Sequence, residues 1–523
     1  MSKKTSARMG ALVGVAVAIF AANHARHRHD ASEDAPAPAA AASSAPVARA
    51  APATWQLGSL QLTACELGQP DSGLSTAAWC ADFPVPENRA DPHSRTIKLK
   101  LAVLRSSAQV ESSDMLAFLA GGPGQAATDS AGMIEATLKP LLAHRSILLL
   151  DQRGTGGSNA LSCKGVDDDG GSGDGAPFDA DKMRSGVKDC LKQLEGRADP
   201  RYYTTTIAAQ DLEDVRKAIG APQFDLVGVS YGTRMAQRYL MRYPDAVRTV
   251  VLDSAVPNSL ALGNDFARNL DDALKAQFER CTADAACKAQ FGDPDQTLYQ
   301  LRDALRANPH EVSFRDPQTY QTVRRRLTED SLASVVRMFA YTPPTAALLP
   351  LSIDAAAHGD VGPLLGQAQI LSGELSELAG SGMQFSVICA EDADLLQARP
   401  DDADTILGTR MVDSLKAVCS VWPHGDRPAD FHQPLKTDKP VLLLAGQYDP
   451  VTPPRYAEEI AKGLPNARVL VLKGQAHSVM AAGCAPELVQ HFVEDADPKA
   501  LDASCLDLLQ PTPIFIDFNG STP

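Results

Sequence analysis

The sequence has no Cys-x-x-Cys pair and no Cys/His grouping with zinc-finger spacing, although it contains 10 cysteines and 11 histidines. Because structural zinc is held by such groupings, we expect no metal site, and we expect no cofactor either. Positive charge is also scarce, with 49 Lys+Arg against 64 Asp+Glu and a net charge of −15. This balance argues against nucleic acid or an anionic membrane surface as a binding partner.

The cysteines fall into successive neighbours that are separated by short to moderate gaps. An even number of cysteines in an exported protein favours a set of local disulfides. Proximity in the sequence alone predicts the pairs Cys65–Cys80, Cys163–Cys190, Cys281–Cys287, Cys389–Cys419 and Cys484–Cys505. The alternative is a set of free, buried thiols in a cytosolic enzyme.

The N-terminus favours export. Three basic residues lie ahead of an apolar run at 9–22, which is the layout of an export signal. The run is shorter than the roughly 20 residues of a membrane span, and the cleavage pattern after it is weak. Residues 1–30 are therefore expected to be either a signal peptide or an uncleaved anchor that tethers the protein to a membrane. An Ala/Pro/Ser-rich linker follows at 31–53, so we expect a periplasmic or secreted protein.

From residue 54 onward, short apolar segments alternate with helical patterns. The segment Ile97–Leu104 predicts a strand near a sheet edge. Buried strands are predicted at 115–120, 146–150, 224–229, 249–252, 441–445 and 468–472. Continuous apolar strands separated by helices indicate an α/β fold with a mostly parallel sheet and helices on both of its faces.

The middle of the chain, at 258–436, lacks this rhythm and is rich in helical patterns. A helical insertion between two sheet-forming halves is the economical explanation. We therefore predict a first core half at 54–257, a helical domain at 258–436 and a second core half at 437–523.

Gly228-Val229-Ser230-Tyr231-Gly232 forms a G-x-S-x-G pattern between a predicted strand and a predicted helix. In this context the pattern is typical of a nucleophile elbow, in which the glycines allow a sharp turn that lifts the serine hydroxyl above the sheet. The helix behind it supplies backbone N–H groups and the positive end of its dipole. Ser230 is therefore the candidate nucleophile, and the alternative is a glycine-flanked serine in an ordinary turn.

A serine hydroxyl needs a base, and an elbow of this type is followed in the chain by an acid and then by a histidine. Asp449 follows the predicted strand at 441–445, and His477 follows the one at 468–472. Because parallel strands end at one edge of a sheet, we expect both residues on the side of Ser230. His477 should take the proton of Ser230, while Asp449 fixes the tautomer of the imidazole.

The oxyanion that forms during such an attack needs preorganised N–H donors. One should come from Tyr231, the residue after the nucleophile. The other should come from the loop Gly121-Gly122-Pro123-Gly124, most directly from Gly122, where no side chain keeps a substrate from the backbone. The alternative role of this glycine run is a simple turn.

These motifs, together with the segment 151–156 (DQRGTG), resemble those of the proline iminopeptidase-like serine peptidases, especially the secreted tripeptidyl aminopeptidase branch. The likeness runs from about Trp55 to the C-terminus. It implies an α/β-hydrolase fold with an inserted helical cap over the active site, and the release of residues from free peptide N-termini. Ala120 departs from the pattern, because many proline iminopeptidases have a histidine there, so proline specificity does not follow.

An aminopeptidase must recognise the ammonium group of its peptide, which calls for a carboxylate. Cys389-Ala390-Glu391-Asp392, in the expected cap, is similar to a segment of that family. The resemblance implies Glu391 as the substrate-binding residue, with Asp392 as the second candidate. The alternative is an ordinary solvated acidic pair.

The leading interpretation is therefore an exported aminopeptidase that acts on peptides through an acyl-enzyme on Ser230. A carboxylesterase or another acyl hydrolase with the same triad is the alternative, because this fold hosts many chemistries. A third interpretation is a catalytically silent binding protein. The sequence leaves the preferred N-terminal residues, the peptide length and the oligomeric state open.

Overall fold

The computed structural model describes residues 53–68, 75–108, 114–163, 178–317, 319–367, 381–517 and 519–521. The predicted signal peptide or anchor at 1–30, and all of the predicted linker except Ala53, lie outside these ranges. Within them, no helix has the length and apolar character that crossing a membrane requires.

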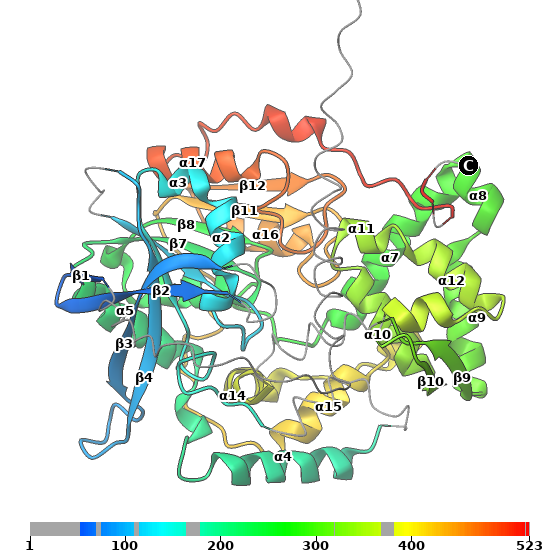
Figure 1. Cartoon of the computed structure of the whole chain (residues 1–523), viewed down its shortest axis with the longest axis horizontal. Coiled ribbons are helices and arrows are strands. Elements are labelled where there is room, and N and C mark those ends of the chain that lie inside the picture. Colours follow the sequence, from blue (N-terminus) through cyan, green and yellow to red (C-terminus); the bar gives the residue numbers. More distant parts are fainter. Residues whose placement is uncertain are drawn as a thin grey trace, which may run out of the picture.

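A 10-stranded sheet forms the centre of the protein (Figure 1). Its strand order is β1-β2-β3-β4-β6-β5-β7-β8-β11-β12. The six strands from β6 to β12 in this order are parallel, while β1 to β4 pair antiparallel with one another and β4 pairs antiparallel with β6. The strands are β1 (Thr54–Leu57), β2 (Leu60–Leu67), β3 (Thr76–Pro86), β4 (Thr96–Leu104), β5 (Met115–Leu119), β6 (Ile147–Leu150), β7 (Phe224–Val229), β8 (Val247–Asp253), β11 (Val441–Gly446) and β12 (Ala467–Leu472). The predicted α/β fold with a mainly parallel sheet is confirmed.

The prediction that Ile97–Leu104 lies near a sheet edge is wrong. This segment forms most of β4, and three further strands, β1 to β3, lie between it and the edge. Those strands mix buried and exposed positions along their length, as β3 shows. They therefore lack the continuous apolar signal that predicts the parallel strands.

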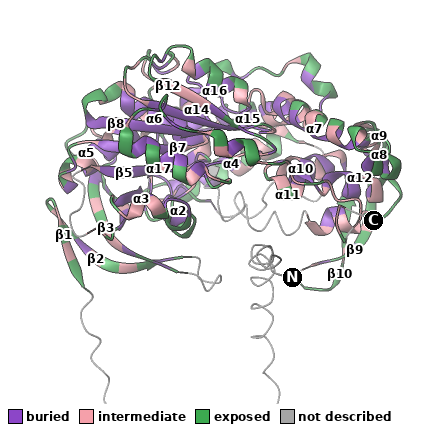
Figure 2. Ribbon diagram, turned by 90° about the horizontal axis from the view of Figure 1, so that it is seen from above, coloured by how far each residue is buried: buried purple, intermediate pink, exposed green. Residues whose placement is uncertain are grey.

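Helices cover both faces of the sheet. Helices α5, α6 and α16 pack on one face, and α2, α3 and α17 pack on the other. Strand β11 presents apolar side chains on both faces of the sheet. Val441, Leu443 and Ala445 belong to the hydrophobic cluster that includes α5, α6 and α16, while Leu442 and Leu444 belong to the cluster that includes α2, α3 and α17. Figure 2 shows these buried strands between the helical layers. The helices are α2 (Ala131–Thr137), α3 (Lys139–Leu142), α5 (Thr205–Ile219), α6 (Tyr231–Arg242), α16 (Pro454–Ala461) and α17 (Ala485–Asp495).

Between β8 and β11 the chain forms a mainly helical segment (Figure 1). Its first part, from α7 to α12, surrounds a hydrophobic core of its own that includes Leu270, Phe314, Leu332 and Ile353. Its second part, α14 and α15, shares the core of the sheet through residues such as Met383. A separate hairpin, β9 (His310–Arg315) and β10 (Thr322–Leu327), belongs to the first part. The helices are α7 (Phe266–Ala283), α8 (Ala285–Phe291), α9 (Pro294–Ala307), α10 (Glu329–Phe339), α11 (Pro343–Ala346), α12 (Leu349–Ala357), α14 (Ser381–Glu391) and α15 (Arg410–Cys419).

The five disulfides pair neighbouring cysteines, which confirms the pairing predicted from proximity. They are Cys65–Cys80, Cys163–Cys190, Cys281–Cys287, Cys389–Cys419 and Cys484–Cys505. No free cysteine occurs in the part of the chain that the structure describes. Five disulfides are typical of proteins that fold in an oxidising compartment.

Replacing Cys389 and Cys419 together by alanine should lower the free energy of unfolding by about 3–4 kcal/mol. The disulfide joins α14 to α15 across 30 residues, so its loss returns the entropy of that loop to the unfolded chain. The urea midpoint and Tm of the double variant measure the effect. Wild-type protein in reductant should shift in the same direction and further, and an unchanged Tm in both samples would contradict the stabilising role.

Candidate active site

Ser230 stands at a sharp turn between β7 and α6. Strand β7 ends at Val229, α6 begins at Tyr231, and Ser230 has φ 55° and ψ −123°. This conformation is rare for a residue with a side chain and costs on the order of 1–3 kcal/mol. The close approach of α6 to β5 requires Gly232, because a Cβ there would lie 2.0 Å from the carbonyl oxygen of Leu119. The turn has the geometry of a nucleophile elbow.

His477 and Asp449 form a hydrogen-bonded pair. The imidazole Nδ1 lies 2.9 Å from Oδ2 and 3.0 Å from Oδ1 of Asp449. The N–H groups of Val451 and Thr452 donate to Oδ1 of the same carboxylate, each at 2.8 Å, and the Thr452 hydroxyl donates to Oδ2 at 2.8 Å. Asp449 is thereby fixed in the loop after β11, and it holds a histidine from the loop after β12.

The nucleophile turn meets the histidine loop at the end of β8. The N–H of Ser230 donates to the carbonyl oxygen of Asp253 at 2.9 Å, and the Asp253 carboxylate accepts the N–H groups of Val479 and Met480. Among the described residues, no hydrogen bond joins the Ser230 hydroxyl to the imidazole of His477. The triad of Ser230, Asp449 and His477 stays a prediction that this arrangement supports.

Burial and charge shift the pKa values of Asp449 and His477 in opposite directions. Burial alone would raise the pKa of Asp449, but the charge of His477 and the hydrogen bonds to the carboxylate hold that pKa below its ordinary value. Burial alone would lower the pKa of His477, but the Asp449 carboxylate raises it above its ordinary value of 6.5. The arrangement thus keeps an ionised carboxylate behind an imidazole that is a stronger base than usual.

The reactivity of Ser230 toward a fluorophosphonate should increase with pH, with a midpoint above 6.5. His477 can accept the serine proton only when its imidazole is neutral, and the raised pKa delays deprotonation to a higher pH. The labelling rate measured from pH 5 to 9 gives the midpoint, and thermal melting at each pH controls for unfolding. A rate that is flat across this range would contradict the role of His477.

The loop 121–124 lies directly against the nucleophile. A Cβ on Gly121 would lie 3.3 Å from the Cβ of Ser230, and Gly122 has φ 104°, a value that favours glycine. The N–H groups of Gly122 and Tyr231 meet no hydrogen-bond acceptor in the part of the chain that the structure describes. Two unsatisfied donors beside Ser230 fit an oxyanion hole, and the assignment of Gly122 and Tyr231 stays a prediction.

The phenol of Tyr231 anchors the start of α6 in a buried network. Its hydroxyl lies 2.7 Å from the Thr205 hydroxyl and accepts a hydrogen bond from Nε2 of Gln152 at 3.0 Å. Burial raises the pKa of Tyr231, so this hydroxyl stays protonated. Helix α5 and the loop after β6 therefore fix the residue that follows the nucleophile.

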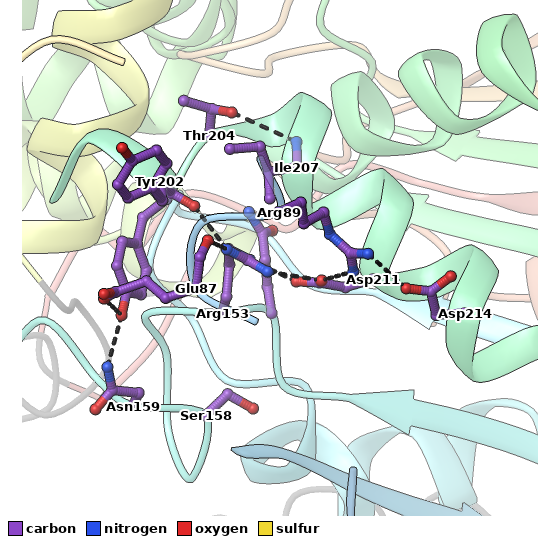
Figure 3. A network of polar contacts seen from close by, with 12 residues as sticks. Glu87, Arg89, Arg153, Ser158, Asn159, Tyr202, Thr204, Ile207, Asp211 and Asp214 are labelled. Atoms are coloured by element: carbon purple, nitrogen blue, oxygen red, sulfur yellow. Dashed lines mark hydrogen bonds and ion pairs between the residues drawn. The ribbon is translucent and has the colours of Figure 1, made fainter. Parts of the chain in front are cut away.

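The loop after β6 is itself held by an arginine that solvent does not reach. Arg153 binds the carboxylate of Asp211 on α5, with Nη2 2.7 Å from Oδ1, and donates to the carbonyl oxygens of Glu87 and Tyr202 (Figure 3). Arg89, in the loop that follows β3, binds the same carboxylate. The segment 151–156, one of the motifs in the sequence, thus contacts α5 through Arg153 and Tyr231 through Gln152.

Glu391 and Asp392 are both buried, with 1% and 0% of their surface exposed, so the alternative of a solvated acidic pair is wrong. Asp392 binds Arg234, with Oδ2 2.7 Å from Nη1, and accepts the N–H of Leu262. Glu391 accepts the N–H of Thr205 at 2.6 Å and its hydroxyl at 2.9 Å. Among the described residues Glu391 has no ion pair, and burial raises its pKa to about 8. The two neighbours therefore differ, because only Asp392 has a cationic partner of its own.

Two residues near His477 are not predicted from the sequence. The Thr452 hydroxyl donates to Asp449 and also lies 3.3 Å from the imidazole Nδ1. A threonine three residues after the candidate acid is a local pattern that could have indicated it. Tyr341, after α10, accepts the N–H of His477 at 3.1 Å through its carbonyl oxygen. Its ring lies edge-on to the imidazole, with 5.3 Å between centroids. This contact joins the helical segment to the site, and no local sequence pattern around Tyr341 indicates it.

A small cavity lies next to the two residues that flank the loop 121–124, Ala120 and Gln125. Its volume is about 20 Å³, which is enough for one water molecule. Ala120, Gln125, Gln152 and Asp211 are among the residues that line it. No group of three or more His, Cys, Asp or Glu side chains in the described ranges is arranged to hold a metal ion.

Residues 115–482 match the family model described as alpha/beta hydrolase fold. The chain is 24% identical over 478 residues to Serine protease Hip1 of Mycobacterium tuberculosis, a match that covers 85% of this chain and 91% of that protein. It is 29% identical over 203 residues to the tripeptidyl aminopeptidase of Streptomyces lividans, which covers 36% of this chain and 37% of the relative.

Among solved structures, the proline iminopeptidase of Mycobacterium smegmatis is 16% identical to the chain. The match covers 80% of this chain and 100% of that one, with a TM-score of 0.37. The region that matches the family model extends from β5 to just beyond the histidine loop. It therefore contains Ser230, Asp449 and His477.

Proposed function

Because the chain belongs to the α/β-hydrolase family, we propose that it is an exported serine hydrolase that releases residues from peptide N-termini through an acyl-enzyme on Ser230. The observation that carries the chemistry is the hydrogen-bonded pair of His477 and Asp449 at the sheet edge where the Ser230 elbow lies. The relatives named as a serine protease and a tripeptidyl aminopeptidase support a peptide substrate. The five disulfides support export.

In this proposal the reaction has two steps. His477 takes the proton of the Ser230 hydroxyl as its oxygen attacks the scissile carbonyl, and the N–H groups of Gly122 and Tyr231 bind the oxyanion. The imidazolium then gives the proton to the departing amine, which leaves an ester on Ser230. A water molecule, activated by the same imidazole, hydrolyses the ester. Asp449 keeps Nδ1–H of His477 directed at itself and stabilises the imidazolium.

Glu391 supports the recognition of a peptide N-terminus. It is a buried carboxyl group whose hydrogen bonds come from Thr205, and Thr205 contacts the phenol of Tyr231 next to the nucleophile. Burial raises the pKa of Glu391 to about 8, although the charge of Arg234 acts in the opposite direction. The ammonium of a peptide would supply the missing charge and hold the carboxylate in its ionised form. Asp392 is a weaker candidate, because Arg234 already neutralises it.

The substrate class is tested by offering the purified protein a peptide p-nitroanilide with a free N-terminus, the same peptide acetylated, and a p-nitrophenyl ester. We expect turnover of the free peptide and a large loss on acetylation, because acetylation removes the ammonium. Turnover of the ester alone would overturn the peptidase assignment in favour of a carboxylesterase. Failure of the wild-type protein to react with a fluorophosphonate would favour a silent binding protein.

Replacing Glu391 with glutamine should raise KM for the free peptide by about 10- to 100-fold, which corresponds to the loss of one hydrogen bond between charged groups. The glutamine keeps the shape of the side chain and can still bond Thr205, so the protein should fold. Initial rates over a range of peptide concentrations give KM, and the ester serves as a substrate without an ammonium. Glu213→Gln is the matched control, because Glu213 is also a buried carboxylate but lies on α5 itself and binds Arg216. Equal effects of the two variants would contradict the role of Glu391.

A further inference from the structure

Strand β8 ends between the strands that carry the nucleophile and the acid. It pairs with β7, which leads to Ser230, on one side and with β11, which leads to Asp449, on the other. Its last residue, Asp253, is 1% exposed, and the next residue, Ser254, has φ 56°. These two residues take part in none of the reaction steps described above.

The side chains of this pair hold the loop that carries His477. Oδ1 and Oδ2 of Asp253 accept the N–H groups of Val479 and Met480, each at 2.9 Å. The hydroxyl oxygen of Ser254 accepts the N–H of Ser478 at 2.8 Å. Asp253, the last residue of β8, and Ser254, the next residue, therefore bind the three consecutive N–H groups that follow His477.

The backbone of the pair reaches the other two loops of the site. The carbonyl oxygen of Asp253 accepts the N–H of Ser230 at 2.9 Å, and the N–H of Ser254 donates to the carbonyl oxygen of Leu444 in β11 at 2.9 Å. The same short segment thus contacts the turn of the nucleophile, the strand before the acid and the loop of the base.

We propose that Asp253 and Ser254 are positioning residues that set the separation between the Ser230 hydroxyl and the imidazole of His477. This inference rests on the proposed function, because it assigns a role in the same triad. Ser478 has φ 64°, a backbone conformation that a residue with a side chain rarely adopts, so the loop needs fixed partners to keep it. A carboxylate suits the task because both of its oxygens accept, whereas an amide or a protonated acid has one acceptor and turns a donor toward the second N–H.

The charged groups that face Asp253 are His477 and Asp449. Burial raises the pKa of Asp253 to about 6, although the hydrogen bonds from Val479 and Met480 act in the opposite direction. Protonation as the pH falls through this value removes one acceptor from the histidine loop. Loss of activity in acid should therefore contain a second step, beyond the protonation of His477, that disappears when Asp253 is replaced.

The test is Asp253→Asn, with Asp225→Asn as the matched control. Asp225 is an equally buried aspartate near the start of β7, its pKa is also raised to about 6 by burial, and it binds Arg248 and Thr249. Asp253→Asn should lower kcat by about 100-fold with KM within about twofold, because misplacement of a catalytic group by about 1 Å costs this much. Asp225→Asn should leave kcat unchanged. The proton NMR signal of His477 Nδ1–H should shift or broaden in the first variant and persist in the second.

The outcomes separate this inference from the proposed function. If the wild-type protein neither hydrolyses peptides nor reacts with a fluorophosphonate, the proposed function fails. If the wild-type is active and Asp253→Asn keeps its kcat and its NMR signal, the positioning role is overturned. If Asp253→Asn does not fold, Ser254→Ala decides, because it leaves the Asp253 carboxylate in place. It removes the acceptor for the N–H of Ser478 and the 3.3 Å hydrogen bond that the same hydroxyl donates to Oδ1 of Asp253. A kcat reduced several-fold with unchanged KM supports the proposal, and a wild-type kcat overturns it.

Discussion

Replacing Ser230 with alanine should lower kcat/KM for a peptide substrate by about 10⁶-fold. The substitution removes the attacking oxygen, while the proposed oxyanion donors and the substrate contacts remain. Residual hydrolysis should therefore still exceed the reaction in water by about 10³-fold. The expected readouts are kcat/KM, complete loss of fluorophosphonate labelling in the intact mass, and a Tm close to that of the wild-type protein.

Ser230→Gly is the informative companion, because the elbow stores backbone strain. Glycine adopts φ 55°, ψ −123° without a clash of Cβ, so this variant should be as inactive as alanine yet more stable than alanine by about 1 kcal/mol. Urea unfolding of the two variants measures the difference. If either variant kept substantial turnover, Ser230 would not be the nucleophile, and if glycine were the less stable variant, the elbow would not be strained.

The candidate triad could be predicted because the relevant information is local. The strands before Ser230, Asp449 and His477 each contain a run of apolar residues, and parallel strands bring their C-terminal ends to one edge. The disulfide pairs were predictable for a similar reason, since the partners are at most 30 residues apart. The outer strands β1 to β3 were not predicted, because one side of them faces solvent and their sequences mix apolar and polar residues.

Contacts between distant segments could not be predicted in the same way. Nothing in Cys389-Ala390-Glu391-Asp392 tells which carboxylate meets Arg234, 158 residues away along the chain. Nor does the sequence near Asp253 indicate that its side chain receives N–H groups from residues more than 220 positions further on. Such pairings depend on the packing of whole layers, and hydrophobic periodicity does not specify them.

Replacing Asp449 with asparagine should lower kcat by about 10⁴-fold while the fold is retained. The amide matches the carboxylate in shape, and its oxygen can still accept the N–H groups of Val451 and Thr452. The neutral amide cannot stabilise an imidazolium. Its NH₂ group, when it faces Nδ1 of His477, favours the tautomer that carries the proton on Nε2, and Nε2 is the nitrogen that should receive the serine proton. Both effects act on the reaction step and not on substrate binding, so KM should change little.

The pH dependence of this variant separates charge from geometry. Asp449 contributes most to raising the pKa of His477 against the effect of burial, and Asp253 contributes less, so in Asp449→Asn the midpoint of the activity profile should move to lower pH. Thr452→Val is the matched control, because it removes the hydroxyl that donates to Oδ2 of Asp449 but leaves the charge in place. It should cost about 10-fold in kcat, the equivalent of one hydrogen bond to a charged group, with a midpoint near that of the wild-type. If Asp449→Asn lost activity but kept the wild-type midpoint, the carboxylate would act on His477 through orientation alone, and the electrostatic part of the assignment would be wrong.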